Sequence, residues 1–210
     1  MSKRIKILAT LGPKSLNKNF LQFAKKNNIS YLRLNMSHIE IRNLAKIINF
    51  IRKYNSKTPI CIDTEGAQIR TKVDIKKFIK KNTIFKLFKK KSSFNLYPNE
   101  VYEKLKKNDV LSIGFDNLKA CITKKTKNYC LLKSISSGLL EANKGVHLVN
   151  RKIKLSYLTE KDLQAIEIGK RFKIKNFALS FTNSINDVLE FNRLLPILKF
   201  FLEIILKIGI

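Results

Sequence analysis

Hydrophobic residues along the first 65 positions follow two alternating spacings. Apolar side chains recur every three or four residues over 16–24 and 41–54, as they do in a helix with one buried face. Before, between and after these segments, apolar runs typical of strands cover 5–12, 30–37 and 58–65. The order strand, helix, strand, helix, strand, with short links, predicts parallel strands joined by right-handed crossovers.

The pattern changes over residues 71–147, where short alternating runs are separated by turn residues. Two of these runs, 119–125 and 129–135, are close enough in sequence to form a hairpin. We therefore expect a small antiparallel β-barrel domain inserted into an α/β domain. The predicted division is 1–70 for the first part of the α/β domain, 71–147 for the insert and 148–210 for the resumed α/β domain.

The first type of pattern returns after the insert. Thr159 and Asp162 have the spacing of a helix N-cap pair, which predicts a helix that runs to Phe172. An apolar run at 176–182 predicts a fourth strand of the α/β domain. A second pair of capping residues, which begins at Ser184, predicts a further helix.

Composition narrows the class of protein. The 210 residues suffice for one large domain, or for one domain with a smaller insert. A hydrophobic content of 44 % with 28 % charged residues predicts a packed core rather than a disordered chain. Cys61, Cys121 and Cys130 are odd in number and unclustered, which predicts ordinary thiols instead of disulfides or a zinc site. The start of the chain has no signal-peptide pattern, so we expect a cytoplasmic location.

The net charge is the most unusual property of the composition. Lys and Arg number 43 against 15 Asp and Glu, which gives a formal net charge of +28. Such a charge attracts nucleic acid, anionic membrane surfaces and phosphorylated metabolites alike. The lysines are spread along the chain, so they give little support to a nucleic-acid partner. Three charges and a proline within the apolar tail 194–210 argue against a transmembrane segment there.

Polar residues lie at or near the carboxyl ends of two of the predicted strands. Alternation in the second strand places Arg33, Asn35 and Ser37 on one face, and Asp63 and Thr64 end the third strand. In parallel α/β sheets, ligands bind at the carboxyl ends of the strands. An amide, two hydroxyls and one carboxylate are hard oxygen ligands that suit a weakly charged cation. The alternative interpretation is an edge strand with one solvated face and a turn with a chance salt bridge.

Arg33 and Arg70 lie near the same strand ends and carry planar guanidinium groups that match phosphate or carboxylate oxygens. Six motifs then occur in order: "ATLGPKS", "LRLNMSH", "IDTEGAQIRT", "KGVHL", "LTEKD" and "ALSFTNS". With these motifs the chain resembles the pyruvate kinase family over nearly all of residues 4–195. The resemblance implies an α/β fold: an incomplete (β/α)8 TIM-type barrel of about four strands, with the small β domain inserted after the third strand as a lid.

The resemblance also implies roles for individual residues in phosphoryl transfer from phosphoenolpyruvate to ADP, which gives pyruvate and ATP in glycolysis. It implies K⁺ and Mg²⁺ as cofactors, with Mg²⁺ bridging substrate and nucleotide. The implied phosphoenolpyruvate-binding residues are Arg33 and Ser180; the implied nucleotide-binding residues are Asn35, His38, Arg70 and Lys144; the implied K⁺ ligands are Asn35, Ser37, Asp63 and Thr64.

Other parts of the family pattern have no counterpart in this chain. A barrel of this type has eight strands and ~250 residues, whereas the patterns here predict four strands. The family's Mg²⁺ ligands and phosphoryl-transfer lysine belong to later strands and a "KIE" motif, where this chain reads "KFFLEIILKIGI". Glu203 in that stretch is not carried over as a ligand, and no residue is assigned as catalytic.

The expectation is therefore a truncated pyruvate kinase-like chain that is inactive alone. A complementing polypeptide or a homo-oligomer is left open as a partner. The alternatives are a catalytically inactive relative that binds a ligand or a protein and, with less support, a basic nucleic-acid-binding protein.

Overall fold

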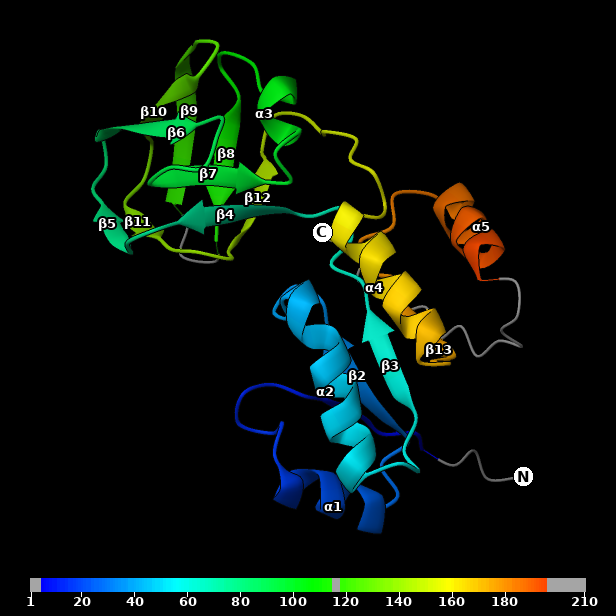
Figure 1. Cartoon of the computed structure of the whole chain (residues 1–210). Coiled ribbons are helices and arrows are strands. Elements are labelled where there is room, and N and C mark those ends of the chain that lie inside the picture. The colour runs from blue at the N-terminus through cyan, green and yellow to red at the C-terminus, as the bar shows by residue number, and fades with distance from the viewer. Residues whose placement is uncertain (1–4, 115–117, 196–210) are drawn as a thin grey trace. The chain divides into compact units, whose positions relative to one another are not determined.

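The computed structural model describes residues 5–114 and 118–195 and divides the chain into two compact units (Figure 1). The first unit combines Met1–Ala67 with Ser156–Ile210, and the second unit is Gln68–Leu155. In sequence, the second unit therefore lies inside the first. The apolar tail 194–210 lies outside the described residues except for its first two positions, and Glu203 lies outside them.

The first unit is built on a parallel sheet with the strand order β1-β2-β3-β13. All four strands were predicted from the sequence, and each is shorter than its apolar run. The strands are β1 (Leu8–Thr10), β2 (Tyr31–Asn35), β3 (Ile60–Asp63) and β13 (Asn176–Ala178); the helices are α1 (Lys18–Lys26), α2 (Ile41–Tyr54), α4 (Glu160–Arg171) and α5 (Ile185–Leu194).

Strand alternation decides which side of this sheet is buried. Leu32 and Leu34 of β2 are completely buried in the apolar core, where they join residues such as Ile48 of α2 and Ile166 of α4. Arg33 and Asn35, on the opposite face, are only half-buried. The predicted alternation in β2 is thus confirmed, and one face of the sheet is left polar.

Both predicted helix starts are confirmed. Thr159 caps α4 by accepting a hydrogen bond from the backbone of Asp162, and the Asp162 carboxylate accepts one from the backbone of Thr159. Ser184 and Asp187 form the same reciprocal box at the start of α5. These pairs satisfy backbone N–H groups that have no partner inside the helix.

The second unit is a closed barrel with the strand order β10-β6-β7-β4-β12-β8-β9, accompanied by a two-stranded sheet of β5 and β11. The predicted hairpin is confirmed as the antiparallel pair β9 and β10. The elements are β4 (Ile69–Val73), β5 (Lys77–Ile79), β6 (Ile84–Phe88), β7 (Phe94–Tyr97), α3 (Val101–Lys104), β8 (Val110–Ile113), β9 (Leu118–Lys125), β10 (Tyr129–Ser134), β11 (Gly138–Leu140) and β12 (Gly145–Leu148).

The expectation of a purely antiparallel barrel is wrong at one pairing. Strands β6 and β7 pair in parallel, through Phe88 and Asn95, while the other neighbouring strands in the described part of the barrel pair antiparallel. The parallel contact is limited to one residue pair because the short link between the strands cannot return the chain along a full strand. The barrel is therefore mixed.

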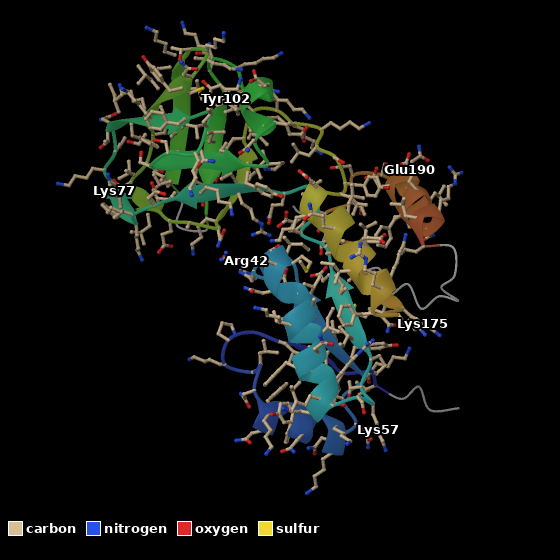
Figure 2. All side chains as sticks on the ribbon, viewed as in Figure 1. Arg42, Lys57, Lys77, Tyr102, Lys175 and Glu190 are labelled. Atoms are coloured by element: carbon tan, nitrogen blue, oxygen red, sulfur yellow. The ribbon has the colours of Figure 1, made fainter. Side chains whose placement is uncertain are left out.

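Lysine side chains project from the surfaces of both units (Figure 2). Lys57 and Lys175 are examples, and each is an exposed residue in a link between a helix and the next strand. Within residues 5–114 and 118–195, no helix has the length and apolar character needed to cross a membrane.

Gly66, three residues after β3, supports a sharp local test of this fold. Its φ of +65° is in the left-handed region, and a Cβ there would lie 2.0 Å from the Ser180 backbone oxygen. We expect Gly66→Ala to lower the free energy of unfolding by at least about 2 kcal/mol, through backbone strain and steric overlap.

Chemical denaturation of the purified variants measures this effect. Gly12→Ala is the matched control, because no atom lies within 4 Å of the Cβ it would add. Equal stabilities of the two variants would contradict the close approach of Gly66 to Ser180.

Candidate functional site

A row of polar side chains crosses all four strands of the first unit near their carboxyl ends. Arg33 of β2 donates from Nη1 to Thr10 Oγ1 of β1 at 2.9 Å and from Nε to Asp63 Oδ2 of β3 at 2.9 Å. Its Nη2 forms an ion pair with the same carboxylate oxygen. Ser180, two residues after β13, donates from Oγ to Asp63 Oδ1 at 2.6 Å. Each strand or strand end therefore contributes one member of the row.

Asp63 is the central residue of this row. Its side chain is only 4 % exposed, whereas that of Arg33 is 18 % exposed. A carboxylate so far from water requires a compensating charge and hydrogen bonds, which Arg33 and Ser180 supply. In return, Asp63 fixes the plane of the guanidinium group on the polar face of the sheet.

Three of the predicted K⁺ ligands lie next to Asp63. The strand register places Asn35 opposite Asp63. Asn35 Oδ1 accepts a hydrogen bond from the Ser37 backbone N–H at 3.0 Å, and Thr64 Oγ1 accepts one from the Ser180 backbone N–H at 3.0 Å. The structure therefore brings Asn35, Ser37, Asp63 and Thr64 to one end of β2 and β3.

The chemistry of this group of four residues fits a monovalent cation. Each of its side chains carries an oxygen atom that can coordinate a cation. Its single carboxylate already faces the positive charge of Arg33. A bound K⁺ would leave a net positive charge, which favours an anionic ligand beside it. His38 is an exposed residue of the turn after β2, next to this group in sequence.

A second polar cluster joins the end of β3 to the start of α4. Glu65 is buried; its Oε1 accepts from Thr159 Oγ1 at 2.9 Å and its Oε2 from Lys161 Nζ at 3.2 Å. The Lys161 ammonium also donates to the backbone oxygen of Met36, after β2. The cluster thus connects the residues after β2, the residues after β3 and the start of α4.

Asp162 completes this second cluster. Its carboxylate accepts from the backbone N–H groups of Glu65 at 2.8 Å and Gly66 at 3.1 Å, in addition to capping α4. Asp162 is fully buried, and burial raises the pKa of its carboxyl group above the usual value for aspartate, although the backbone donors oppose this shift. The sequence showed Asp162 as a capping residue, but not its contacts with the segment after β3.

Two predicted nucleotide-binding residues belong to the second unit. Gly145 of β12 pairs with Arg70 of β4, so Arg70 and Lys144 lie on adjacent strands or strand ends. Lys144 Nζ is 3.1 Å from a carboxylate oxygen of Glu141. Lys76 contacts the other oxygen at 2.5 Å, and the two ammonium groups, chiefly Lys76, lower the pKa of Glu141.

Within the described part of the chain, no group of three or more His, Cys, Asp and Glu residues is placed to hold a metal ion. Cys61, Cys121 and Cys130 form no disulfide bond in the described structure.

Comparison with known proteins gives one consistent result. A family model described as pyruvate kinase, barrel domain, matches residues 2–209. Curated pyruvate kinases from Buchnera aphidicola of Acyrthosiphon pisum and of Schizaphis graminum are 27 % and 30 % identical, over 91 % and 92 % of this chain. The pyruvate kinase of Methanocaldococcus jannaschii is 29 % identical over 99 % of the chain. The matched regions span only 43–44 % of these three relatives.

The ion pair between Glu65 and Lys161 offers a test of the second cluster. We expect Lys161→Met to lower the free energy of unfolding by about 1–3 kcal/mol, because it removes the Lys161 ammonium from the buried Glu65 carboxylate. Adding Glu65→Gln to Lys161→Met should recover part of this loss, since it removes the charge that Lys161 faces in the native chain.

A double-mutant cycle in chemical denaturation measures the coupling. The control is Glu167→Gln, which removes an exposed partner of Arg171 on the same helix and should change stability by less than about 0.5 kcal/mol. Additive effects of the Glu65 and Lys161 substitutions would contradict the buried ion pair.

Proposed function

This chain belongs to the pyruvate kinase family, and we propose that it takes part in phosphoryl transfer from phosphoenolpyruvate to ADP, which gives pyruvate and ATP. We assign it the parts of the site that bind phosphoenolpyruvate and K⁺. The observation that carries this assignment is the row Thr10–Arg33–Asp63–Ser180 at the carboxyl ends of four adjacent parallel strands. We propose a cytoplasmic location for this glycolytic role.

The proposed fold follows from the same family membership. We propose that the first unit is the first part of a (β/α)8 barrel and that the second unit is the inserted lid domain. Support comes from the parallel strand order of the first unit and from the position of the second unit in sequence, between β3 and α4.

Arg33 is the proposed ligand of the phosphoenolpyruvate phosphate. A guanidinium group has five N–H donors, and the hydrogen bonds to Thr10 and Asp63 use three of them. The remaining donors can meet phosphate oxygens in a group whose plane Asp63 and Thr10 already fix. Ser180 is proposed to line the same pocket, beside Asp63.

The proposed K⁺ ligands are Asn35, Ser37, Asp63 and Thr64. When bound, K⁺ would add positive charge beside Arg33 and so strengthen the attraction for the substrate anion. Mg²⁺, which the family uses to bridge substrate and nucleotide, is assigned to no described residue. Glu203 lies outside the described residues.

The proposed nucleotide contacts are Asn35 and His38 from the first unit and Arg70 and Lys144 from the second. Lys144 is paired with Glu141, which also contacts Lys76. A nucleotide phosphate would therefore compete with Glu141 for Lys144. Because Lys76 can keep the Glu141 carboxylate compensated, the release of Lys144 costs less than the loss of an isolated ion pair.

Binding and turnover can be tested separately. The chain spans about two fifths of the length of its curated relatives, and the resemblance assigns the Mg²⁺ ligands and the phosphoryl-transfer lysine to other motifs. We therefore propose binding without turnover by residues 1–210 alone, and activity with a complementing polypeptide or within a homo-oligomer. A ligand-binding relative without any catalytic role is the alternative.

For binding, we expect residues 1–210 to bind phosphoenolpyruvate more tightly in K⁺ than in tetramethylammonium buffer, as measured by calorimetry. Arg33→Met should weaken binding by at least about tenfold, the effect of losing a charge-assisted hydrogen bond. Arg33→Lys keeps the charge near Asp63 and controls for loss of folding. Arg42→Met, which removes a mostly exposed arginine paired with Glu40, should leave affinity unchanged.

A coupled assay with phosphoenolpyruvate, ADP, Mg²⁺ and K⁺ completes the test. Turnover by residues 1–210 alone would contradict the proposed inactivity. Absence of turnover with an added carboxyl-terminal fragment of a relative, together with intact binding, would favour the non-catalytic alternative. Absence of any K⁺-dependent phosphoenolpyruvate binding would overturn the proposed function.

A further inference from the structure

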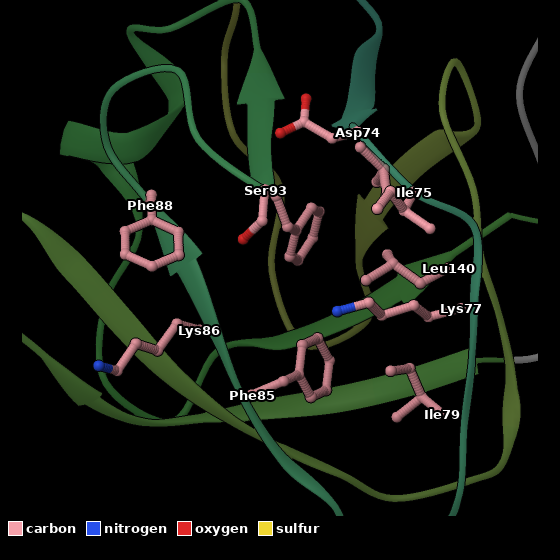
Figure 3. A pocket seen from close by; sticks show the side chains of 11 residues that line it. Asp74, Ile75, Lys77, Ile79, Phe85, Lys86, Phe88, Ser93 and Leu140 are labelled. Carbon is pink, nitrogen blue, oxygen red and sulfur yellow. The ribbon is translucent and has the colours of Figure 1, made fainter.

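The second unit contains a cavity that is separate from the residues assigned above. Its volume is about 370 Å³, which is in the range of small-molecule sites. Eleven residues from β4 to β7 and from β11, with the links between these strands, line it (Figure 3). None of these residues belongs to the proposed phosphoenolpyruvate, K⁺ or nucleotide contacts.

The wall of this cavity is largely apolar and aromatic. Phe85 and Phe94 are stacked, with ring centroids 6.1 Å apart and an interplanar angle of 29°. Ile79 and Leu140 are buried beside them, and Phe88 adds a third aromatic ring. Flat aromatic faces of this kind favour contact with another planar ring.

One positive charge reaches into this apolar space. Lys77 of β5 lies opposite Leu140 of β11, and its side chain extends across the cavity toward Phe85 (Figure 3). The neighbouring Lys76 is paired with Glu141, whereas no ion pair or side-chain hydrogen bond is present for Lys77 in the described part of the chain. Lys77 is thus available to pair with a ligand.

The other charged lining residues do not compensate Lys77. No ion pair joins Asp74 to Lys77 in the described part of the chain, and the Lys86 side chain points away from the centre of the cavity (Figure 3). Lys86 Nζ instead lies 4.9 Å from the centroid of the Tyr129 ring. Ser93 adds a hydroxyl at the rim, where it can donate a hydrogen bond. An anion is therefore favoured over a cation inside the cavity.

From this arrangement we infer that the cavity binds a small amphipathic anion: a planar ring that carries one carboxylate or phosphate group. The ring packs against Phe85 and Phe94, and the anionic group pairs with Lys77 and accepts a hydrogen bond from Ser93. The surrounding unit carries 22 Lys and Arg residues against 6 Asp and Glu residues, which further attracts anions to its surface.

The site can be tested with 2-naphthoate, 1-naphthyl phosphate and the neutral 2-naphthamide, using the whole chain. Binding is followed by amide chemical shifts in two-dimensional NMR spectra. We expect one or both anions to shift the amides of Val73, Lys77, Ile79 and Leu140, with at least about tenfold weaker binding of the amide. The two anions distinguish a carboxylate ligand from a phosphate ligand.

Matched variants isolate the contribution of Lys77. Lys77→Gln should weaken binding of the preferred anion by at least about tenfold. Lys81→Gln removes the same charge from an exposed turn outside the cavity and should change affinity by less than about twofold. Ile75→Glu, at a residue that is 69 % exposed, places a negative charge at the rim and should also weaken binding without disturbing the core.

Equal affinities for the anions and for 2-naphthamide, or an equal effect of Lys77→Gln and Lys81→Gln, would overturn this inference. So would shifts confined to residues of the first unit. Phosphoenolpyruvate has no ring and should not displace the naphthyl anion. Because the readout is binding in the second unit, this result is independent of whether the proposed enzymatic function holds.

Discussion

The first unit depends on the buried carboxylate of Asp162. It caps α4 and also accepts hydrogen bonds from the backbone of Glu65 and Gly66, 97 and 96 residues earlier in the chain. These contacts join the segment where the chain leaves the first unit to the segment where it returns. The ion pair of Glu65 with Lys161, which also reaches the Met36 backbone, reinforces the same junction. Polar contacts that are buried in this way are costly to break, so the ends of β2 and β3 are held in a defined arrangement.

This arrangement gives Asp63 two tasks on the polar face of the sheet. Its carboxylate holds the plane of Arg33, and it is also a member of the group of oxygen donors proposed for K⁺. Before ligands bind, the negative charge of Asp63 balances the positive charge of Arg33 at the strand ends. The apolar face does not share this constraint, because Leu32 and Leu34 are completely buried against the helices.

Local sequence patterns predicted most of the helices and strands. They could not predict contacts between residues that are far apart in the sequence. The alternation in β2 and the capping pairs at Thr159 and Ser184 act within a few residues, and the structure confirms them. Glu65 has no local partner, so its pairing with Lys161, 96 residues away, could not be read from spacing. The parallel contact of β6 with β7 was missed because neighbouring strands with a short link usually pair antiparallel. No local feature of the sequence distinguishes Lys77 from the other lysines, because its place in the cavity depends on the pairing of β5 with β11, opposite Leu140.

The position of the second unit in sequence has a consequence for how the chain folds. Pairing of β3 with β13 joins Cys61 to Asn176, whereas the hairpin of β9 and β10 closes over a few residues. Closing a long flexible loop costs more entropy than closing a short one, and contacts distant in sequence slow folding. The barrel of the second unit is therefore expected to form early and to shorten the effective loop. During synthesis, the β3 edge stays unpaired until β13 has emerged, which exposes that edge to other chains in the interval.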